Sequence, residues 1–518
     1  MASIYHSWPT LARAAPRLSR RFFDCHHCIR KTPQSPSTPS LSRLILKSSA
    51  LRGLKGPRFY SANAATVKPT ISPLGSLSKT IIPKISGGYF PKTNSNAVAY
   101  WLLGSAASVY GIVVFGGLTR LTESGLSITE WRPVTGSIPP LSDADWDYEF
   151  QRYQASPEFK QLNSAMTLSE FKYIYYMEWT HRLWGRVVGL SFLLPATYFI
   201  ARRRVTASMA AKITGIAGLI GFQGIIGWWM VKSGLKDDLF APGSHPRVSQ
   251  YRLTAHLGTA FLCYTAMLWN GLSILRENRL LRNPSAAVEQ LSLLRSAPFT
   301  PLRRSVGALA CLVFITAMSG GLVAGLDAGL IYNEFPYMGL GLTPPKSELF
   351  SDFYSRRPDG SDIWWRNMLE NPSTVQLDHR ILATSTFTAV VALWTYTRFS
   401  PALRRAALPL PVRRGVLGVV HLVSLQVLLG LGTLLYLVPV PLAAAHQAGS
   451  LALLSGVILL GSRVWVPRRL VRSVAEAAKS RARYPAAKTA APGGQAWSTT
   501  LTRAMPRGGQ GVGKINSS

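Results

Sequence analysis

Four histidines occur where polar segments give way to long apolar runs. His181 and His379 open two of these runs, and His256 and His446 open two others. An ionisable side chain inside a membrane span is costly, so four of them at matching positions indicate a function. Two imidazoles that face each other across a helical bundle are suited to hold the iron of a haem. Copper and zinc remain alternatives, although neither pair is accompanied by a cysteine or a third histidine.

Charged residues accompany two of the histidines. Glu178 lies three residues before His181, which places both on one face of a helix, and Arg182 follows directly. The second copy of this motif has Gln376 in place of the glutamate and Arg380 after its histidine. Because a carboxylate titrates and an amide does not, we predict chemistry at the first motif and a permanent electron-carrying haem at the second. Both arginines are suited to pair with haem propionates.

The sequence contains an internal repeat. Gly116-Gly117-Leu118 recurs as Gly320-Gly321-Leu322, and the histidine motifs follow in the same order, with Gln223 matched by Gln426. We therefore predict a duplicated four-span unit whose copies have the same orientation. Within each unit the second and fourth spans descend from the same side, so the histidines pair as His181 with His256 and His379 with His446.

The apolar residues are gathered into runs of about a membrane's thickness. We predict an all-α polytopic membrane protein with eight transmembrane helices, arranged as two tandem pseudo-symmetric four-helix bundles. The predicted spans are 97–118, 180–201, 210–231, 254–275, 305–326, 378–398, 414–437 and 442–464.

The formal net charge of +34 would suggest nucleic-acid binding in a soluble protein. Here the basic residues lie in the leader, in alternate loops and in the tail, which is typical of targeting and topology, so we predict no nucleic-acid partner. The charge pattern places both termini on the positive, matrix side of a mitochondrial membrane. The predicted organisation is 1–60 mitochondrial presequence, 61–96 flexible matrix arm, 97–275 N-terminal bundle, 276–304 matrix linker, 305–464 C-terminal bundle and 465–518 disordered basic tail.

Five motifs together resemble the haem A synthase family over roughly residues 95–465. They are Gly116–Leu126, Glu178–Arg182, Thr254–Leu257, Leu377–Arg380 and Ala445–Gln447. The resemblance implies a multi-pass mitochondrial inner-membrane oxidoreductase that oxidises the C8 methyl group of haem O to a formyl group for cytochrome c oxidase.

The resemblance also implies roles for the site residues. His181 and His256 would bracket the substrate haem O in the N-terminal bundle, and Glu178 would be the essential carboxylate. His379 and His446 would ligate haem b in the C-terminal bundle. A matrix ferredoxin and its reductase would supply electrons, and haem O synthase and cytochrome c oxidase assembly factors are further expected partners beside the membrane lipid.

Several alternatives stay open at this point. If both axial positions of the substrate iron are histidines, either one ligand leaves to admit dioxygen, or electrons are withdrawn and water supplies the oxygen. Self-association is not decided by the sequence. The main rival function is a bis-histidine di-haem electron-transfer cytochrome, which gives Glu178 no role, and a haem transporter with parallel repeats is a weaker one.

Overall fold

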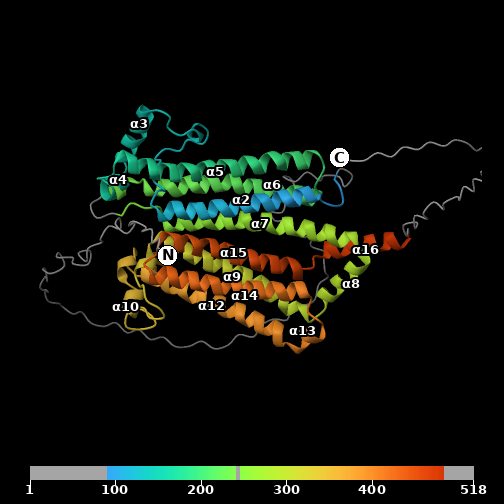
Figure 1. The fold of residues 1–518 in the computed structure, drawn as a ribbon. Coiled ribbons are helices and arrows are strands. Elements are labelled where there is room, and N and C mark those ends of the chain that lie inside the picture. The colour runs from blue at the N-terminus through green and yellow to red at the C-terminus, as the bar shows by residue number, and fades with distance from the viewer. Residues whose placement is uncertain (1–89, 241–244, 484–518) are drawn as a thin grey trace, which may run out of the picture. The chain divides into compact units, whose positions relative to one another are not determined.

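The computed structural model describes residues 90–240 and 245–483 (Figure 1). These residues form helices joined by loops, and no β-strand occurs among them. The expected presequence and most of the expected matrix arm lie outside the described residues. The prediction of an all-α fold is confirmed for the part of the chain that is described.

Eight long helices form the body of the described protein. They are α2 (Asn96–Leu121), α5 (Leu168–Ala201), α6 (Ala207–Val231), α7 (Gln250–Arg282), α9 (Phe299–Gly325), α12 (Pro372–Phe399), α14 (Leu410–Leu435) and α15 (Val440–Val464). Seven spans, one in the region of each of these helices except α12, are long and apolar enough to cross a membrane. Helix α12 is rich in threonine and carries Asp378, His379 and two arginines, so its mean hydropathy is too low for it to count as a span. The predicted count of eight spans is therefore not confirmed.

The long helices pack as two groups of four, related by the sequence repeat. Helices α2, α5, α6 and α7 contact one another, and so do α9, α12, α14 and α15 (Figure 1). The groups meet along two seams that the repeat relates, α2 against α15 and α7 against α9, and α7 also contacts α15. One apolar core, with Val109, Phe261, Leu309 and Val457 among its buried members, includes residues from both groups.

Local sequence signals explain where these helices begin. Ser95, Thr206 and Asn371 cap α2, α6 and α12, each accepting a backbone N–H with its side chain. Helix α5 begins with a capping box between Thr167 and Glu170. It therefore starts well before the apolar run, and its first turns extend beyond the predicted span.

Short helices gather at the end of the bundles where α5 begins (Figure 1). The first connection forms η2 (Thr135–Ser137), α3 (Asp143–Gln154) and α4 (Pro157–Leu162). The second forms η5 (Ala328–Leu330), α10 (Lys346–Leu349), η6 (Asp352–Tyr354) and α11 (Ile363–Glu370). Trp146 and Tyr153 of α3 pack with Phe171 and Tyr175 of α5 in a separate small core. We call this end of the molecule the outer end.

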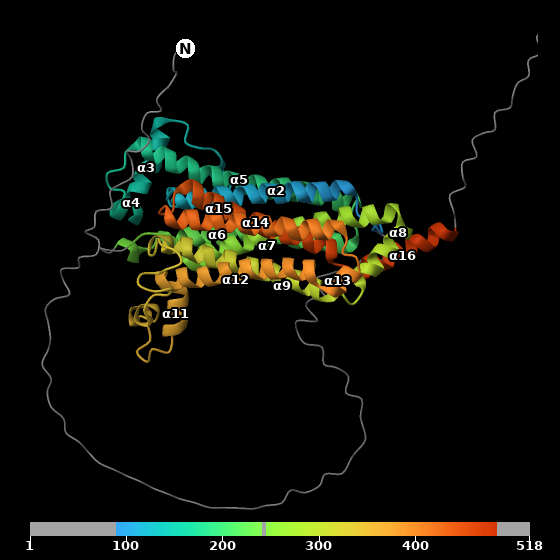
Figure 2. The same ribbon diagram turned by 60° about the horizontal axis from the view of Figure 1, so that its bottom comes forward.

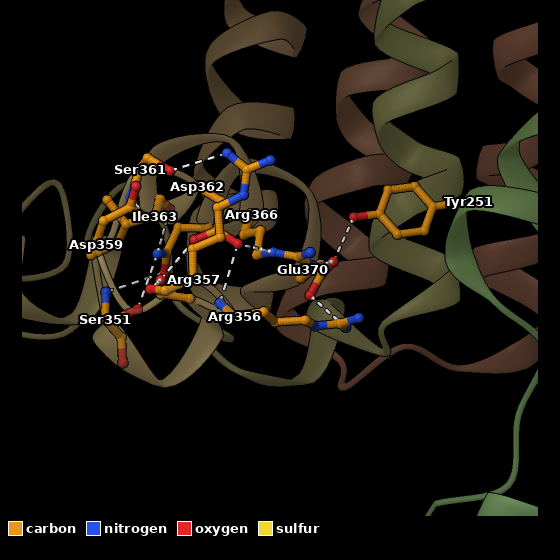
Figure 3. A network of polar contacts seen from close by, with 12 residues as sticks. Tyr251, Ser351, Arg356, Arg357, Asp359, Ser361, Asp362, Ile363, Arg366 and Glu370 are labelled. Carbon is orange, nitrogen blue, oxygen red and sulfur yellow. Dashed lines mark hydrogen bonds and ion pairs between the residues drawn. The ribbon is translucent and has the colours of Figure 1, made fainter.

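A polar network fixes α11 at the outer end (Figure 3). Arg366 donates to Asp362 at 2.5 Å and to Glu370 at 2.7 Å, one helical turn away on either side. Tyr251, from the start of α7, donates to the same Glu370 at 2.9 Å. The outer connection of the second group is therefore bonded to a helix of the first group.

The opposite end carries α8 (Pro284–Arg295), α13 (Pro401–Arg405) and α16 (Arg468–Arg483) (Figure 2). Leu470 and Val474 of α16 are buried against Leu291 of α8. The expectation of disorder from residue 465 is therefore wrong for α16. Its apolar residues recur at helical spacing, and the high proportion of arginine and alanine obscured that pattern.

Candidate functional site

The histidine pair of the second bundle has the spacing of two ligands on one metal ion. The ring centres of His379 and His446 lie 6.4 Å apart, with the ring planes at 89°. A coordinating imidazole nitrogen lies about 2 Å from its metal and the ring centre about 1 Å farther, so two axial imidazoles on one metal have ring centres about 6 Å apart. These residues therefore fit a haem iron held between two histidines.

Neighbouring side chains orient both rings of this pair. Ser319 Oγ lies 2.8 Å from Nδ1 of His379. The side-chain amide of Gln426 lies 3.0 Å from Nδ1 of His446 and donates to the backbone carbonyl of the same residue at 2.8 Å. Ser319 Oγ, which donates to the carbonyl of Thr316, can accept from Nδ1–H of His379 and so leaves Nε2 of that ring for a metal, the usual arrangement of metal-binding histidines. The NH2 group of Gln426 can only donate, so its contact with Nδ1 of His446 fixes the position of that ring and does not select the tautomer of a metal ligand.

The histidine pair of the first bundle is held less firmly. His181 and His256 occupy the positions in the first bundle that the repeat matches to His379 and His446. Gln223 donates to the backbone carbonyl of His256 at 2.8 Å, as Gln426 does in the second bundle, but Nδ1 of His256 is buried without a partner. Phe115 stands where the repeat places Ser319, so the ring of His181 lacks the matching hydroxyl. The two pairs are alike in position and differ in how tightly their rings are fixed.

A glycine faces each of the four rings. A Cβ atom at Gly116 would lie 3.0 Å from Nε2 of His181, and Cβ atoms at Gly227, Gly320 and Gly430 would lie 3.0, 3.1 and 2.8 Å from Cε1 of the other three histidines. These glycines occupy equivalent positions on α2 and α9 and on α6 and α14. Any larger residue would move the ring, so the space around each imidazole depends on glycine.

Glu178 holds the outer connection of the first bundle. Its Oε2 accepts from Ser127 Oγ and from the backbone N–H of Ile128, both at 2.7 Å. Its Oε1 accepts from Nε and Nη2 of Arg182 at 3.0 and 2.6 Å. Arg182 donates further to the carbonyl oxygens of Ile128 and Glu130 at 2.8 and 2.9 Å. The carboxylate is 3% exposed and has hydrogen bonds on both oxygens.

In the second bundle, Gln376 and Arg380 hold the outer connection in the way that Glu178 and Arg182 hold it in the first, with an amide in place of the carboxylate. We call each of these residue pairs an anchor. Gln376 donates to the carbonyl of Tyr332 at 3.0 Å, and Arg380 donates to the carbonyls of Tyr332, Glu334 and Tyr337 at 3.0, 2.9 and 3.1 Å. Both motif arginines thus bond the loop above their histidine. The pairing of Arg182 and Arg380 with haem propionates stays a prediction.

A second carboxylic acid lies near Glu178, outside the spans. Glu158 of α4 is 4% exposed and accepts from Tyr153 Oη at 3.3 Å. Burial is the main cause that raises its pKa to about 8, and the charges of Glu178 and Glu123 act in the same direction. A polar cavity of about 330 Å³ adjoins the anchor and is lined by Arg182 among others.

The structure adds residues that the sequence interpretation missed. Ser319, Gly227 and Gly430 contact the histidine rings, and Gln426 was noted only as a repeat landmark. A full alignment of the two repeat copies would have found these glycines, because Gly227 of the first copy aligns with Gly430 of the second. Among the described residues no group of three His, Cys, Asp or Glu side chains could hold a metal ion, so the copper or zinc alternative gains no support.

Two repeated four-helix groups, each with a histidine pair towards the outer end, define a polytopic membrane protein with two paired-histidine sites. The family described as "Cytochrome oxidase assembly protein", COX15-CtaA, matches residues 99–458. This chain belongs to that family.

Three relatives span most of the chain. "Heme A synthase COX15" of Saccharomyces cerevisiae is 52% identical over 386 residues, which cover 74% of this chain and 78% of the relative. "Heme A synthase COX15" of Homo sapiens is 47% identical over 374 residues, covering 71% and 83%. The "Heme A synthase-mitochondrial ferredoxin fusion protein" of Schizosaccharomyces pombe is 49% identical over 395 residues, covering 75% of this chain and 63% of the fusion protein.

Proposed function

We propose that this protein makes haem A by oxidising the C8 methyl group of haem O to a formyl group. Relatives named for this activity are about half identical to the chain over most of its length. The observation that carries the assignment within the molecule is the difference between the two histidine pairs. One pair has both rings fixed through Nδ1, and the other has an unpartnered Nδ1.

The loosely held pair, His181 and His256, binds the substrate haem O. A substrate must arrive and a product must leave, so rings without fixing hydrogen bonds suit this site better than rings that are locked. Glu178 closes the outer side of this site by bonding the loop from Ser127 to Glu130 over the histidine helix. The loop excludes water from the first site as long as the carboxylate and Arg182 remain paired.

The fixed pair, His379 and His446, holds a resident haem b. When bound there, haem b supplies one-electron transfer. The contributions of the chain are to orient both imidazoles through Ser319 and Gln426 and to keep side chains away from them with Gly320 and Gly430. The fit is supported by the 6.4 Å separation of the rings.

A ferredoxin supplies the electrons. The relative in Schizosaccharomyces pombe is fused to a mitochondrial ferredoxin, and fusion of two proteins keeps an electron donor close to its acceptor. The spans make this chain a multi-pass membrane protein, and we place it in the mitochondrial inner membrane with both ends of the chain in the matrix, on the basis of the loop charges.

The test is to incubate the purified protein with haem O, reduced ferredoxin and air, and then to extract and identify the haems. Formyl-bearing haem is the expected product. Recovery of unchanged haem O, with both haems reduced and reoxidised normally, would instead indicate the di-haem electron-transfer cytochrome.

A further inference from the structure

An apolar groove of about 580 Å³ lies between α6, α7 and α9. Its volume is within the range of about 300–1,000 Å³ that is usual for ligand sites. No ionisable side chain is among its lining residues, which include Phe222, Ile225, Trp229, Leu262, Phe314 and Met318. Several of these are exposed, Ile225 by 55% and Leu262 by 52%, so the groove is open along one side.

The groove adjoins the first histidine pair. Ala255 lines it and directly precedes His256 on α7. Ile226 and Trp228 also line it, and Gly227 between them is the residue that faces the ring of His256. The residues that flank the contact of Gly227 with His256 on both helices therefore border the groove, which places the groove beside the first histidine pair.

The equivalent place in the second bundle is bridged by polar bonds. The repeat places Tyr110 where α9 has Phe314, and Gln447 where α7 has Leu257. Tyr110 Oη donates to the carbonyl of Ala448 at 2.8 Å, and Gln447 donates to the carbonyl of Val113 at 2.9 Å. Hydrogen bonds thus join α2 to α15 at this position. At the equivalent position between α7 and α9, apolar side chains line the groove instead.

We propose that the groove binds the isoprenoid chain of the substrate. Haem O differs from haem b in carrying a long farnesyl substituent, so a site for haem O needs an apolar channel that a site for haem b does not. The groove is apolar throughout except for Thr259, and it adjoins the histidine pair assigned to haem O. The inference rests on the proposed function and adds the means by which the first bundle selects its haem.

The test uses two matched variants of the full-length protein, purified with its resident haem. Ile225→Trp fills the groove. Leu428→Trp makes the same change at the equivalent position of α14, where the side chain is 67% exposed. Haem O and haem b are each titrated into the protein, and the dissociation constants of the first site are compared. We expect Ile225→Trp to weaken haem O binding by about tenfold or more, given the apolar area that it displaces, and to leave haem b binding unchanged. Leu428→Trp should change neither.

A measurement on the unmodified protein guards against a folding defect in the variant. Free farnesol should compete with haem O and raise its apparent dissociation constant, without affecting haem b. Equal weakening of both haems by Ile225→Trp, or no effect of farnesol, would overturn the groove assignment. Displacement of a copurified phospholipid with no change in haem O affinity would also overturn it and identify a lipid site. Conversion of haem O to haem A by the wild type is measured separately. The groove assignment can therefore be refuted without refuting the proposed function.

Discussion

Replacing Glu178 by glutamine should release the outer connection of the first bundle. The carboxylate accepts four hydrogen bonds, two on each oxygen. An amide keeps one accepting oxygen and turns the other position into a donor. Because every partner donates, the new N–H groups would face either Arg182 or the N–H of Ile128.

The cost follows from burial. Removing one partner of a buried ion pair costs about 3–5 kcal/mol. Arg182 is 20% exposed and Glu178 is 3% exposed, so water can partly compensate, and the lower value of about 3 kcal/mol applies. That value corresponds to a change of roughly a hundredfold in the equilibrium between the bonded and released loop.

Hydrogen exchange at the amide of Ile128 measures this equilibrium, since the N–H is bonded to the carboxylate. We expect Glu178→Gln to speed exchange there by about a hundredfold, to leave the haem of the second bundle in place and to stop haem A formation. Glu170→Gln provides the control, because it changes an exposed capping residue of the same helix, where glutamine also serves.

Two results would refute the reasoning. Unchanged exchange at Ile128 would mean that the carboxylate does not hold the loop. Faster exchange with a normal rate of haem A formation would mean that the anchor is unnecessary for the reaction, and would remove Glu178 from it.

Three further predictions concern other parts of the site. Ser319→Ala should weaken retention of the resident haem by about 10- to 100-fold, as measured by haem loss on dilution, since it removes the partner of His379. Gly430→Ala should lower haem content, because its Cβ would lie 2.8 Å from the ring of His446, whereas Gly432→Ala should not, since its nearest contact would be 3.7 Å away; absorbance per protein compares them. Glu158 has a pKa raised from 4.5 to about 8. The folded state therefore holds more protons than the unfolded state between these values, and stability should fall as pH rises from about 4.5 to 8. In thermal unfolding, Glu158→Gln should reduce this dependence of stability on pH. An unchanged pH dependence would mean that other groups cause it.

Hydrophobic runs and the repeat were sufficient to predict the long helices and the two groups they form. Each predicted span lies within or close to an observed helix, because about twenty apolar residues have few alternatives to a helix in a membrane. Only the helix ends differ, and α5 differs most, since its capping box lies in polar sequence that hydropathy does not detect. Hydropathy also fails for α12, a long helix whose polar residues lower its mean hydropathy below that of a membrane span.

The contacts made by the site residues were harder to predict. The repeat predicted that His379 lies near His446, and their rings are 6.4 Å apart. The pairing of His181 with His256 stays a prediction. The bonds of Arg182 and Arg380 to loop carbonyls could not be predicted, because they depend on how each outer connection folds back. Ser319 escaped notice because its counterpart is a phenylalanine, so the repeat gave it no emphasis.

Asp327 illustrates how the two halves recognise each other. It follows α9 in a left-handed conformation, with φ at 52°, and accepts from Arg120 at 2.7 Å and Arg247 at 3.0 Å, both from the first half of the chain. In lipid, the packing of apolar helix faces against one another adds little stability, because lipid is equally apolar. A few polar bonds and close glycine contacts therefore decide which helix faces pack together.

Each half contributes its first and its last helix to these seams. A four-helix unit expressed alone would thus present both sides of its own interface, and two copies could join by the same contacts about a two-fold axis. The present chain has the geometry of such a dimer joined into one polypeptide. Because the two halves differ in sequence within one chain, Asp327 has arginine partners that its own half does not supply.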